Sequence, residues 1–205
     1  MRIIGITGGI GSGKSKVLEI LDSHDYIYTI EADALAHRMF EPGEKVYENI
    51  VLSFGREILS SDGRIDRKVL AGIVMNDEKS LARLNAIVHP EVKEYIKHDI
   101  IRKNGDYKFY VIEAALLIQD GYKEICDEIW YIYADRQTRI NRLMKWRGFT
   151  ESKAIEYMNN QPDDAFFIEN TDIVIDNSMD TFSDEEEGMK KLKASLEIAL
   201  GRFRK

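Results

Sequence analysis

The sequence predicts an α/β protein with a mostly parallel β-sheet flanked by helices and interrupted by a helical insertion. The first observation is an alternation of short apolar segments, rich in Ile, Val and Tyr, with segments of helical periodicity. Such alternation is typical of parallel sheets that helices cover on both faces. A C-terminal helix is expected after Ser183, which forms a capping-box pattern with Glu186. The expected strands are residues 2–6, 26–30, 108–112, 128–133 and 172–175.

The second observation is the uneven spacing of these strands. Roughly 75 residues of helical pattern separate the second strand from the third, far more than one crossover needs. We therefore expect a helical insertion at about residues 34–105 and a second excursion at about residues 135–169. The 205 residues would then form one domain, whose core consists of residues 1–33, 106–134 and 170–205.

Composition argues against several classes of protein. The chain carries 29 basic and 36 acidic residues, whereas a nucleic-acid-binding protein usually has a basic face. A phosphate pocket needs only a few local cations, so the net charge of −7 is compatible with phosphorylated metabolites. No apolar stretch approaches the ~18–20 residues that span a bilayer, and the first strand leaves no room for a signal peptide. We expect a cytoplasmic protein that binds neither nucleic acid nor membrane; the sequence carries no signal about oligomeric state.

The single cysteine, Cys126, excludes an intrachain disulfide and is typical of a reducing cytosol. A lone thiol can act as a nucleophile, but no catalytic motif surrounds this one. The favoured interpretation is a small, buried apolar residue.

The strongest functional signal is the segment GGIGSGKS at residues 8–15, which fits the pattern G-x-x-x-x-G-K-[ST]. It follows an expected strand and opens an expected helix. Glycines let successive backbone N–H groups turn toward phosphate oxygens without Cβ clashes, and a helix N-terminus adds unpaired donors. In this pattern Lys14 reaches the β- and γ-phosphates of ATP, and the Ser15 hydroxyl ligates Mg²⁺. A glycine-rich turn without a ligand is disfavoured, because so dense a run of glycines destabilises a fold that does not use it.

The loop alone does not distinguish a kinase from a switch GTPase or a motor ATPase. The guanine signature Asn-Lys-x-Asp and the switch motif Asp-x-x-Gly are both absent from the sequence. A dinucleotide-binding loop is excluded, because Lys14 stands where G-x-G-x-x-G requires its last glycine. A kinase needs an acceptor pocket, a base and a cationic lid, and the sequence offers candidates for each.

Two carboxylates follow expected strands, where the carboxyl ends of a parallel sheet bind ligands. Asp33, in TIEADALAH, can accept a proton from an attacking hydroxyl. It is equally interpreted as a helix N-cap, since Asp before Ala-Leu-Ala caps well, and the two roles are compatible. Glu113 ends the third strand, where it can hold Mg²⁺ or its water; the alternative is an exposed acid at a strand end.

Four arginines mark the segment after the fourth strand. Steps of three residues keep Arg136, Arg139 and Arg142 near one helix face, and guanidinium groups suit the charge that develops on a transferring phosphoryl group. A charged helix face is usually only solvated, and we favour that interpretation for Arg136 and Arg139. Arg142 and Arg147 remain candidates for the cationic lid.

Together these residues resemble the dephospho-coenzyme A kinase family over nearly the whole chain. The similar segments are GITGGIGSGKS, Ala32-Asp33, FGREILSSDGRIDRKVLAGIV, LNAIVHPEV, ALLI, RLMKWR (similar to an R-L-x-x-R lid) and TDIVIDN. The resemblance implies a P-loop NTPase fold with a helical acceptor-binding insertion and a mobile lid. It implies transfer of the ATP γ-phosphate to the ribose 3′-hydroxyl of dephospho-coenzyme A, with Mg²⁺.

The resemblance also implies roles for particular residues. Asp33, Lys14 and Arg142 would be catalytic, and Ser15 and Glu113 would bind the metal. The implied ATP-binding residues are Gly9, Gly11, Ser12, Gly13, Lys14, Ser15, Lys16, Arg142, Arg147 and Asn177. The implied substrate-binding residues are Asp33, His37, Arg67, His89 and Leu116. A core or capping role for His89 stays open.

The chain departs from the family pattern at four places. They are Glu31 for the first Asp of Asp-Ala-Asp, Lys16 where Thr is common, Gln119 where Glu is frequent, and Gly148 where Asp is usual. None of them removes Lys14, Ser15, Asp33 or Arg142. Two other functions stay open: a different small-molecule or nucleoside monophosphate kinase on the same scaffold, and a non-catalytic nucleotide-binding module, which would not need Asp33 together with a cationic lid.

Overall fold

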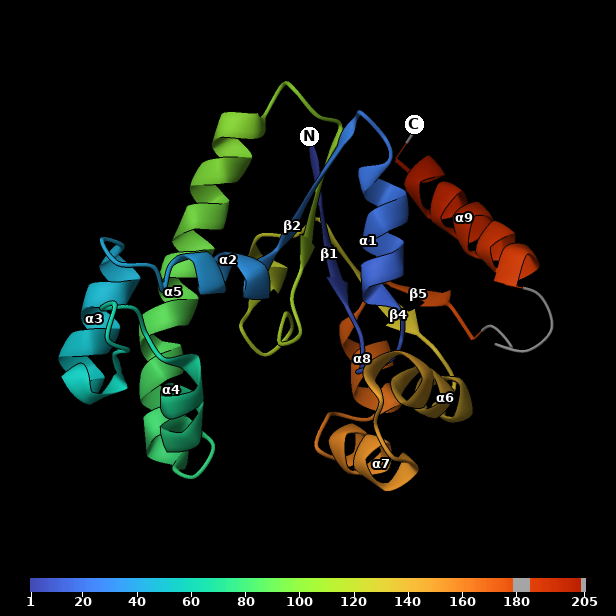
Figure 1. Cartoon of the computed structure of the whole chain (residues 1–205). Coiled ribbons are helices and arrows are strands. Elements are labelled where there is room, and N and C mark those ends of the chain that lie inside the picture. Colours follow the sequence, from blue (N-terminus) through green and yellow to red (C-terminus); the bar gives the residue numbers. More distant parts are fainter. Residues whose placement is uncertain (179–184, 204–205) are drawn as a thin grey trace. The chain divides into compact units, whose positions relative to one another are not determined.

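The computed structural model describes residues 1–178 and 185–203 (Figure 1). The chain forms two compact units: Met1–Ile30 together with Gly105–Lys205, and Glu31–Asn104. The expected cap residue Ser183 lies outside the described residues, and the C-terminal helix α9 is described from Glu185 to Gly201. Among residues 1–178 and 185–203, no helix combines the length and apolarity that a membrane crossing requires.

The first unit is built on a five-stranded sheet with the strand order β2-β3-β1-β4-β5. The strands are β1 (Arg2–Thr7), β2 (Ile27–Glu31), β3 (Phe109–Glu113), β4 (Glu128–Tyr133) and β5 (Ile173–Asp176). β1 pairs in parallel with β3 on one side and β4 on the other, and β4 pairs in parallel with β5. The predicted α/β class is confirmed, and each predicted strand lies within one residue of its observed position.

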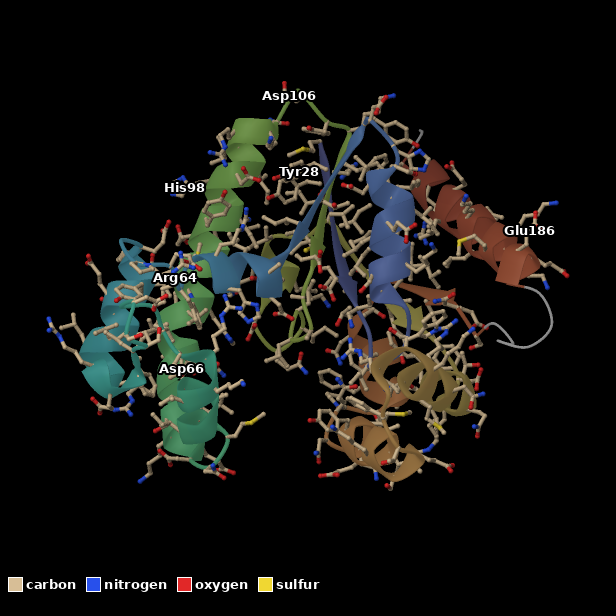
Figure 2. The ribbon with its side chains drawn as sticks, in the orientation of Figure 1. Tyr28, Arg64, Asp66, His98, Asp106 and Glu186 are labelled. Carbon is tan, nitrogen blue, oxygen red and sulfur yellow. The ribbon has the colours of Figure 1, made fainter. Side chains whose placement is uncertain are left out.

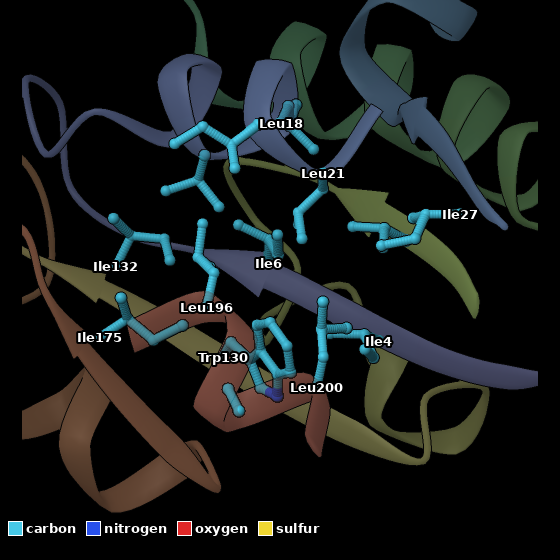
Figure 3. Packing of buried hydrophobic residues seen from close by; sticks show 14 of the residues in the cluster. Ile4, Ile6, Leu18, Leu21, Ile27, Trp130, Ile132, Ile175, Leu196 and Leu200 are labelled. Atoms are coloured by element: carbon cyan, nitrogen blue, oxygen red, sulfur yellow. The ribbon is translucent and has the colours of Figure 1, made fainter. Parts of the chain in front are cut away.

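One face of the sheet packs against α1 (Lys14–Asp22) and α9 (Figure 1). Because side chains alternate along a strand, Ile4 and Ile6 of β1 and Trp130 of β4 point to this face. They meet leucines of both helices in the main core, as Figure 3 shows. Leu21 and Leu200 are among the leucines completely or almost completely buried there.

The opposite face carries the second half of the alternation. Tyr131 stacks on Phe167 of α8 (Asp164–Asn170) with a centroid separation of 4.8 Å. Between β4 and β5 the chain also forms α6 (Arg136–Arg147) and α7 (Glu151–Asn159). A short 3₁₀ helix, η2 (Tyr122–Glu124), precedes β4. The sheet of this unit is therefore covered by helices on both faces, as the sequence predicts.

The second unit is helical, as the spacing of the strands predicts. Its elements are α2 (Ala32–Arg38), α3 (Lys45–Phe54), η1 (Arg56–Ile58), α4 (Arg67–Val74) and α5 (Glu78–Lys103). Ile50, Ile58 and Ile96 are fully buried in it. Asp66, labelled in Figure 2, caps α4 by accepting hydrogen bonds from the backbone N–H groups of Lys68 and Val69.

The interpretation of Asp33 as a helix N-cap is wrong. α2 begins directly at Ala32, so Glu31 occupies the cap position and Asp33 lies in the first turn with an exposed side chain. β2 ends at Glu31 and α2 begins at the next residue, which leaves no turn for Asp33 to close. Its place in the first turn still suits the helix dipole.

The two tryptophans give a direct test of the main core. Trp130 is fully buried, whereas Trp146 is 67% exposed. We expect Trp130→Ala to lower the free energy of unfolding by about 3–5 kcal/mol through lost burial and a cavity. Trp146→Ala, the matched control, should change it by less than about 0.5 kcal/mol. Urea unfolding followed by circular dichroism measures both, and equal losses in the two variants would contradict this assignment of the core.

The candidate phosphate-binding site

The glycine-rich loop connects β1 to α1, and the side chains of Arg139 and Asn177 pack closely against it. Gly13 has φ +95°, and a Cβ added there would clash with Nδ2 of Asn177. A Cβ on Gly9 would clash with the guanidinium of Arg139. The loop therefore requires glycine both for its left-handed backbone and for the close approach of side chains.

Lys14 turns back over the loop that precedes it. Its Nζ donates a hydrogen bond to the carbonyl of Gly8 at 2.9 Å and lies 3.6 Å from Oε1 of Glu113. Glu113 is placed there by strand pairing, since β3 lies beside β1 with Glu113 opposite Ile6. The interpretation of Glu113 as an exposed acid is wrong, because its side chain is buried beside this ammonium.

Arg142 and Asn177 bind the second half of the loop. Asn177 is buried just after β5, and its Nδ2 donates to the carbonyl of Ser12 at 2.8 Å. Nη1 of Arg142 donates to the carbonyls of Ser12 (3.2 Å) and Gly11 (3.4 Å), and Nη2 donates to the carbonyl of Asn177 at 2.8 Å. Burial lowers the pKa of Arg142 below its usual value, yet a guanidinium stays charged at neutral pH.

The interpretation of Arg139 as a solvated residue is wrong. Its side chain is only 8% exposed, and its Nε donates to the carbonyl of Ile10 at 2.8 Å. Its Nη1 lies 3.8 Å from a carboxylate oxygen of Asp164. The three-residue step to Arg142, which puts both on one helix face, was the available signal. By contrast Arg136 is exposed, as predicted, and donates to Asn159 at 3.3 Å.

These side chains fix the direction of the loop's peptide groups. The carbonyls of Gly8, Ile10 and Ser12 all accept hydrogen bonds from surrounding side chains. In a planar trans peptide the following N–H points the opposite way, so three amide groups point away from the side chains that hold the carbonyls. They belong to Gly9, Gly11 and Gly13. The arrangement leaves these three backbone donors directed away from the holding side chains, followed by the N-terminus of α1.

Two buried hydroxyls beside the loop, those of Thr7 and Ser12, can donate hydrogen bonds to an oxygen-rich ligand. In the part of the chain that the structure describes, the buried atoms Thr7 Oγ1, Ser12 Oγ and Asn177 Oδ1 have no hydrogen-bond partner within the protein. An unpaired buried polar atom costs about 1–3 kcal/mol, and such groups cluster at functional sites. Ser15, at the start of α1, has an exposed side chain.

Other predicted residues of this unit lie farther along its helices and turns. The ammonium of Lys16 is bonded to Glu19 at 2.8 Å, within α1. Arg147 is exposed at the last position of α6, before the left-handed Gly148. Leu116, in the turn after β3, is 42% exposed.

Four of the predicted substrate-binding residues belong to the helical unit: Asp33, His37, Arg67 and His89. Asp33 is exposed on α2, and Arg67, the first residue of α4, donates to the carbonyl of His37 at 3.3 Å. His37 and Arg67 are therefore neighbours. His89 lies partly buried on α5, next to Pro90, which the helix contains without ending.

The fold is shared with solved structures. A crystal structure of a Thermus thermophilus protein matches with a TM-score of 0.78 and 28% identity, covering 98% of this chain and 97% of that one. A dephospho-CoA kinase from Campylobacter jejuni matches with a TM-score of 0.70 and 24% identity, covering 99% and 100%. With the loop geometry, these likenesses define the chain as a protein of the P-loop NTPase fold.

Sequence comparison specifies the family. A family model described as dephospho-CoA kinase matches residues 2–182. A dephospho-CoA kinase from Geobacter sulfurreducens is 38% identical over 180 residues, which cover 87% of this chain and 90% of the relative. The chain belongs to the dephospho-CoA kinase family, a family of ATP-dependent kinases, and the family predicted from its motifs is confirmed.

Cys126 lies apart from this chemistry, packed beneath β1 where its Sγ faces Gly5. Burial raises the pKa of its thiol to about 12, and the neighbouring Asp127 and Asp172 add to the increase.

Because the reactive species is the thiolate, we expect Ellman's reagent at pH 8 to label Cys126 in the native protein at least about a hundredfold more slowly than in the guanidinium-unfolded chain. The neutral thiol's contribution to stability should be complete below the unfolded pKa and lost as the pH rises toward 12. Equal labelling rates would restore the nucleophile interpretation.

Proposed function

We propose that this protein transfers the γ-phosphate of ATP to the ribose 3′-hydroxyl of dephospho-coenzyme A. The observation that carries the proposal is a phosphate loop with its lysine in place, 2.9 Å from the Gly8 carbonyl, in a chain that the family model matches over residues 2–182. The same match disfavours another small-molecule or nucleoside monophosphate kinase. A non-catalytic module would leave the pairing of Lys14 with the buried Glu113 unexplained.

The loop and Lys14 would hold the triphosphate. The amides of Gly9, Gly11 and Gly13 supply donors for phosphate oxygens, with Ser12 and Lys16 of the same loop and helix start beside them. The Lys14 ammonium already faces the loop, from which it would reach the β- and γ-phosphates. Its partner Glu113 keeps the charge compensated before ATP binds.

The residues present fit Mg²⁺ as it is bound in kinases. Mg²⁺ keeps several waters and takes few protein ligands besides phosphates. The exposed hydroxyl of Ser15 and the carboxylate of Glu113 are enough for such a site. The ion would neutralise charge on the β- and γ-phosphate oxygens. We assign Ser15 as the direct ligand and Glu113 as the acid that holds the ion's water.

Residues of α6 and of the segment after β5 would complete the ATP site. Arg142 carries a charged guanidinium beside the loop and can stabilise the transferring phosphoryl group. Asn177 holds the loop through its hydrogen bond to the Ser12 carbonyl. Arg147 would approach the phosphates when the lid segment, residues 135–169, closes. Closure matters because water would otherwise compete as the phosphoryl acceptor.

The helical unit would supply the acceptor site. Asp33 accepts the proton of the 3′-hydroxyl or orients it as its oxygen attacks the γ-phosphorus and the bond to ADP breaks. Arg67 and the adjacent His37, with His89, are candidates for contacts to the substrate's phosphates. Leu116 offers an apolar surface to the acceptor. We place the reaction in the cytoplasm, in agreement with the low cysteine content of the chain.

An acceptor panel tests the function. ADP release is measured with dephospho-coenzyme A, AMP, CMP, pantetheine phosphate and shikimate as acceptors, and we expect dephospho-coenzyme A to give the highest kcat/KM. Faster turnover of a nucleoside monophosphate would refute the assignment.

Lys14→Ala should lower kcat by about 10²–10³ or more through lost transition-state stabilisation while leaving the fold intact. A Lys14→Ala variant that retains more than about a tenth of the wild-type kcat/KM would refute the role of Lys14.

Asp33→Asn tests the acceptor side. Because Asp33 is exposed and does not cap α2, the variant should lose less than about 1 kcal/mol of stability, the scale of a helix-dipole interaction. We expect kcat to fall by about 10²–10⁴ if Asp33 is the general base, with little change in ATP affinity. A fall of only about tenfold would indicate orientation of the hydroxyl in a loose transition state. The matched control is Glu44→Gln, an exposed acid at the start of α3, and near-wild-type kcat in a folded Asp33→Asn protein would eliminate both roles.

A further inference from the structure

Ile10, at the apex of the phosphate loop, is held by the lid segment through all of its groups. Its backbone N–H donates to Oε1 of Gln161 at 2.7 Å, and its carbonyl accepts from Nε of Arg139 at 2.8 Å. Its side chain packs against an apolar cluster of α6 and α7 that includes Leu143 and Met158. The apex is thus fastened to residues more than a hundred positions away in sequence.

The two holding side chains belong to one connected network. Nη2 of Arg139 also donates to Oε1 of Gln161 at 3.4 Å, and Arg139 lies 3.8 Å from Asp164. Asp164 in turn accepts from the hydroxyl of Tyr131 in β4 at 2.6 Å. The network therefore runs from the central sheet, through the start of α8 and the α6 face, to the loop.

The network carries an energetic cost that a purely structural contact would not require. Arg139 is buried, and desolvation lowers its pKa below the usual value. Replacing such buried charges by apolar side chains of similar volume often leaves stability unchanged or increases it. Here the charge is directed at a loop carbonyl, and it lies where only glycine fits at position 9.

We propose that Gln161 and Arg139 are positioning residues that hold the loop apex, through Ile10, in the shape that the phosphates of ATP require. The Ile10 amide is committed to Gln161, so the loop binds phosphates through its other amides. The affinity for ATP then depends on where α6 and the segment between α7 and α8 stand. This inference rests on the proposed function of the loop and extends it to two residues that do not touch the nucleotide.

Gln161 gives the sharper test, because its side chain is partly exposed and its replacement leaves the buried charge in place. Gln161→Leu removes the acceptor for the Ile10 amide, and Gln161→Glu keeps it. We expect Gln161→Leu to raise both the Kd of ATP by calorimetry and its KM about tenfold, the equivalent of one hydrogen bond. We expect kcat with dephospho-coenzyme A to stay within about twofold and the melting temperature to be unchanged. Gln161→Glu adds a negative charge beside the phosphate loop but keeps the acceptor, so it should bind ATP more tightly than Gln161→Leu and less tightly than the wild type.

Controls separate positioning from general damage. Asn160→Ala and Arg136→Ala, exposed neighbours of the two positions, should leave the Kd, the KM and kcat unchanged. Arg139→Lys, which keeps the charge but cannot bond Ile10, Gln161 and Asp164 together, should raise the Kd of ATP as Gln161→Leu does.

Three results would overturn the inference: an unchanged Kd in Gln161→Leu, equal weakening in Gln161→Glu, or a loss of affinity that follows a lowered melting temperature. If the wild-type protein binds ATP but does not phosphorylate dephospho-coenzyme A, the proposed function fails. The comparison of ATP affinities then still decides the positioning role.

Discussion

The constraint on which the site depends is the anchoring of the loop's carbonyl groups. Lys14, Arg139 and Asn177 each donate to a different carbonyl between β1 and α1, and peptide planarity then sets the direction of the N–H groups. A flexible glycine-rich loop would lose much conformational entropy on binding a polyphosphate. Here most of that entropy is already lost when the protein folds, so more of the binding energy of ATP is available for catalysis.

The anchoring in turn depends on the topology of the sheet. β1 is central, with β3 on one side and β4 on the other, so the chain that leaves each neighbouring strand passes the loop. β3 ends in Glu113, while β4 leads into α6 and β5 leads into Asn177. Parallel strands bring their carboxyl ends to one edge, and this is why residues from four separate parts of the sequence meet there.

Much of this arrangement is predictable from the sequence, because its signals are local. Apolar alternation and glycine spacing fix the strands and the loop within a residue or so. Side chains whose burial is decided by distant partners are not predictable in that way. Arg139 has the sequence environment of a solvated helix residue, and it is buried by the approach of groups distant in sequence, among them the phosphate loop and Asp164. The burial of Glu113 beside Lys14 follows from the register of β3 against β1, which the sequence does not show. Asp33 does not cap α2 because the helix begins one residue earlier, at Ala32.

The attachment of α6 has a mechanical consequence for the lid segment. Its first two turns are held to the loop by Arg139 and Arg142, while Arg147 follows Arg142 by five residues, about 140° around the helix axis. In the lid closure proposed above, the start of α6 would therefore stay with the loop, while the end of α6 and α7 would move. Any such movement would pull on Ile10 through the apolar cluster of α6 and α7. Opening for product release and loosening of the phosphate grip would then be one movement.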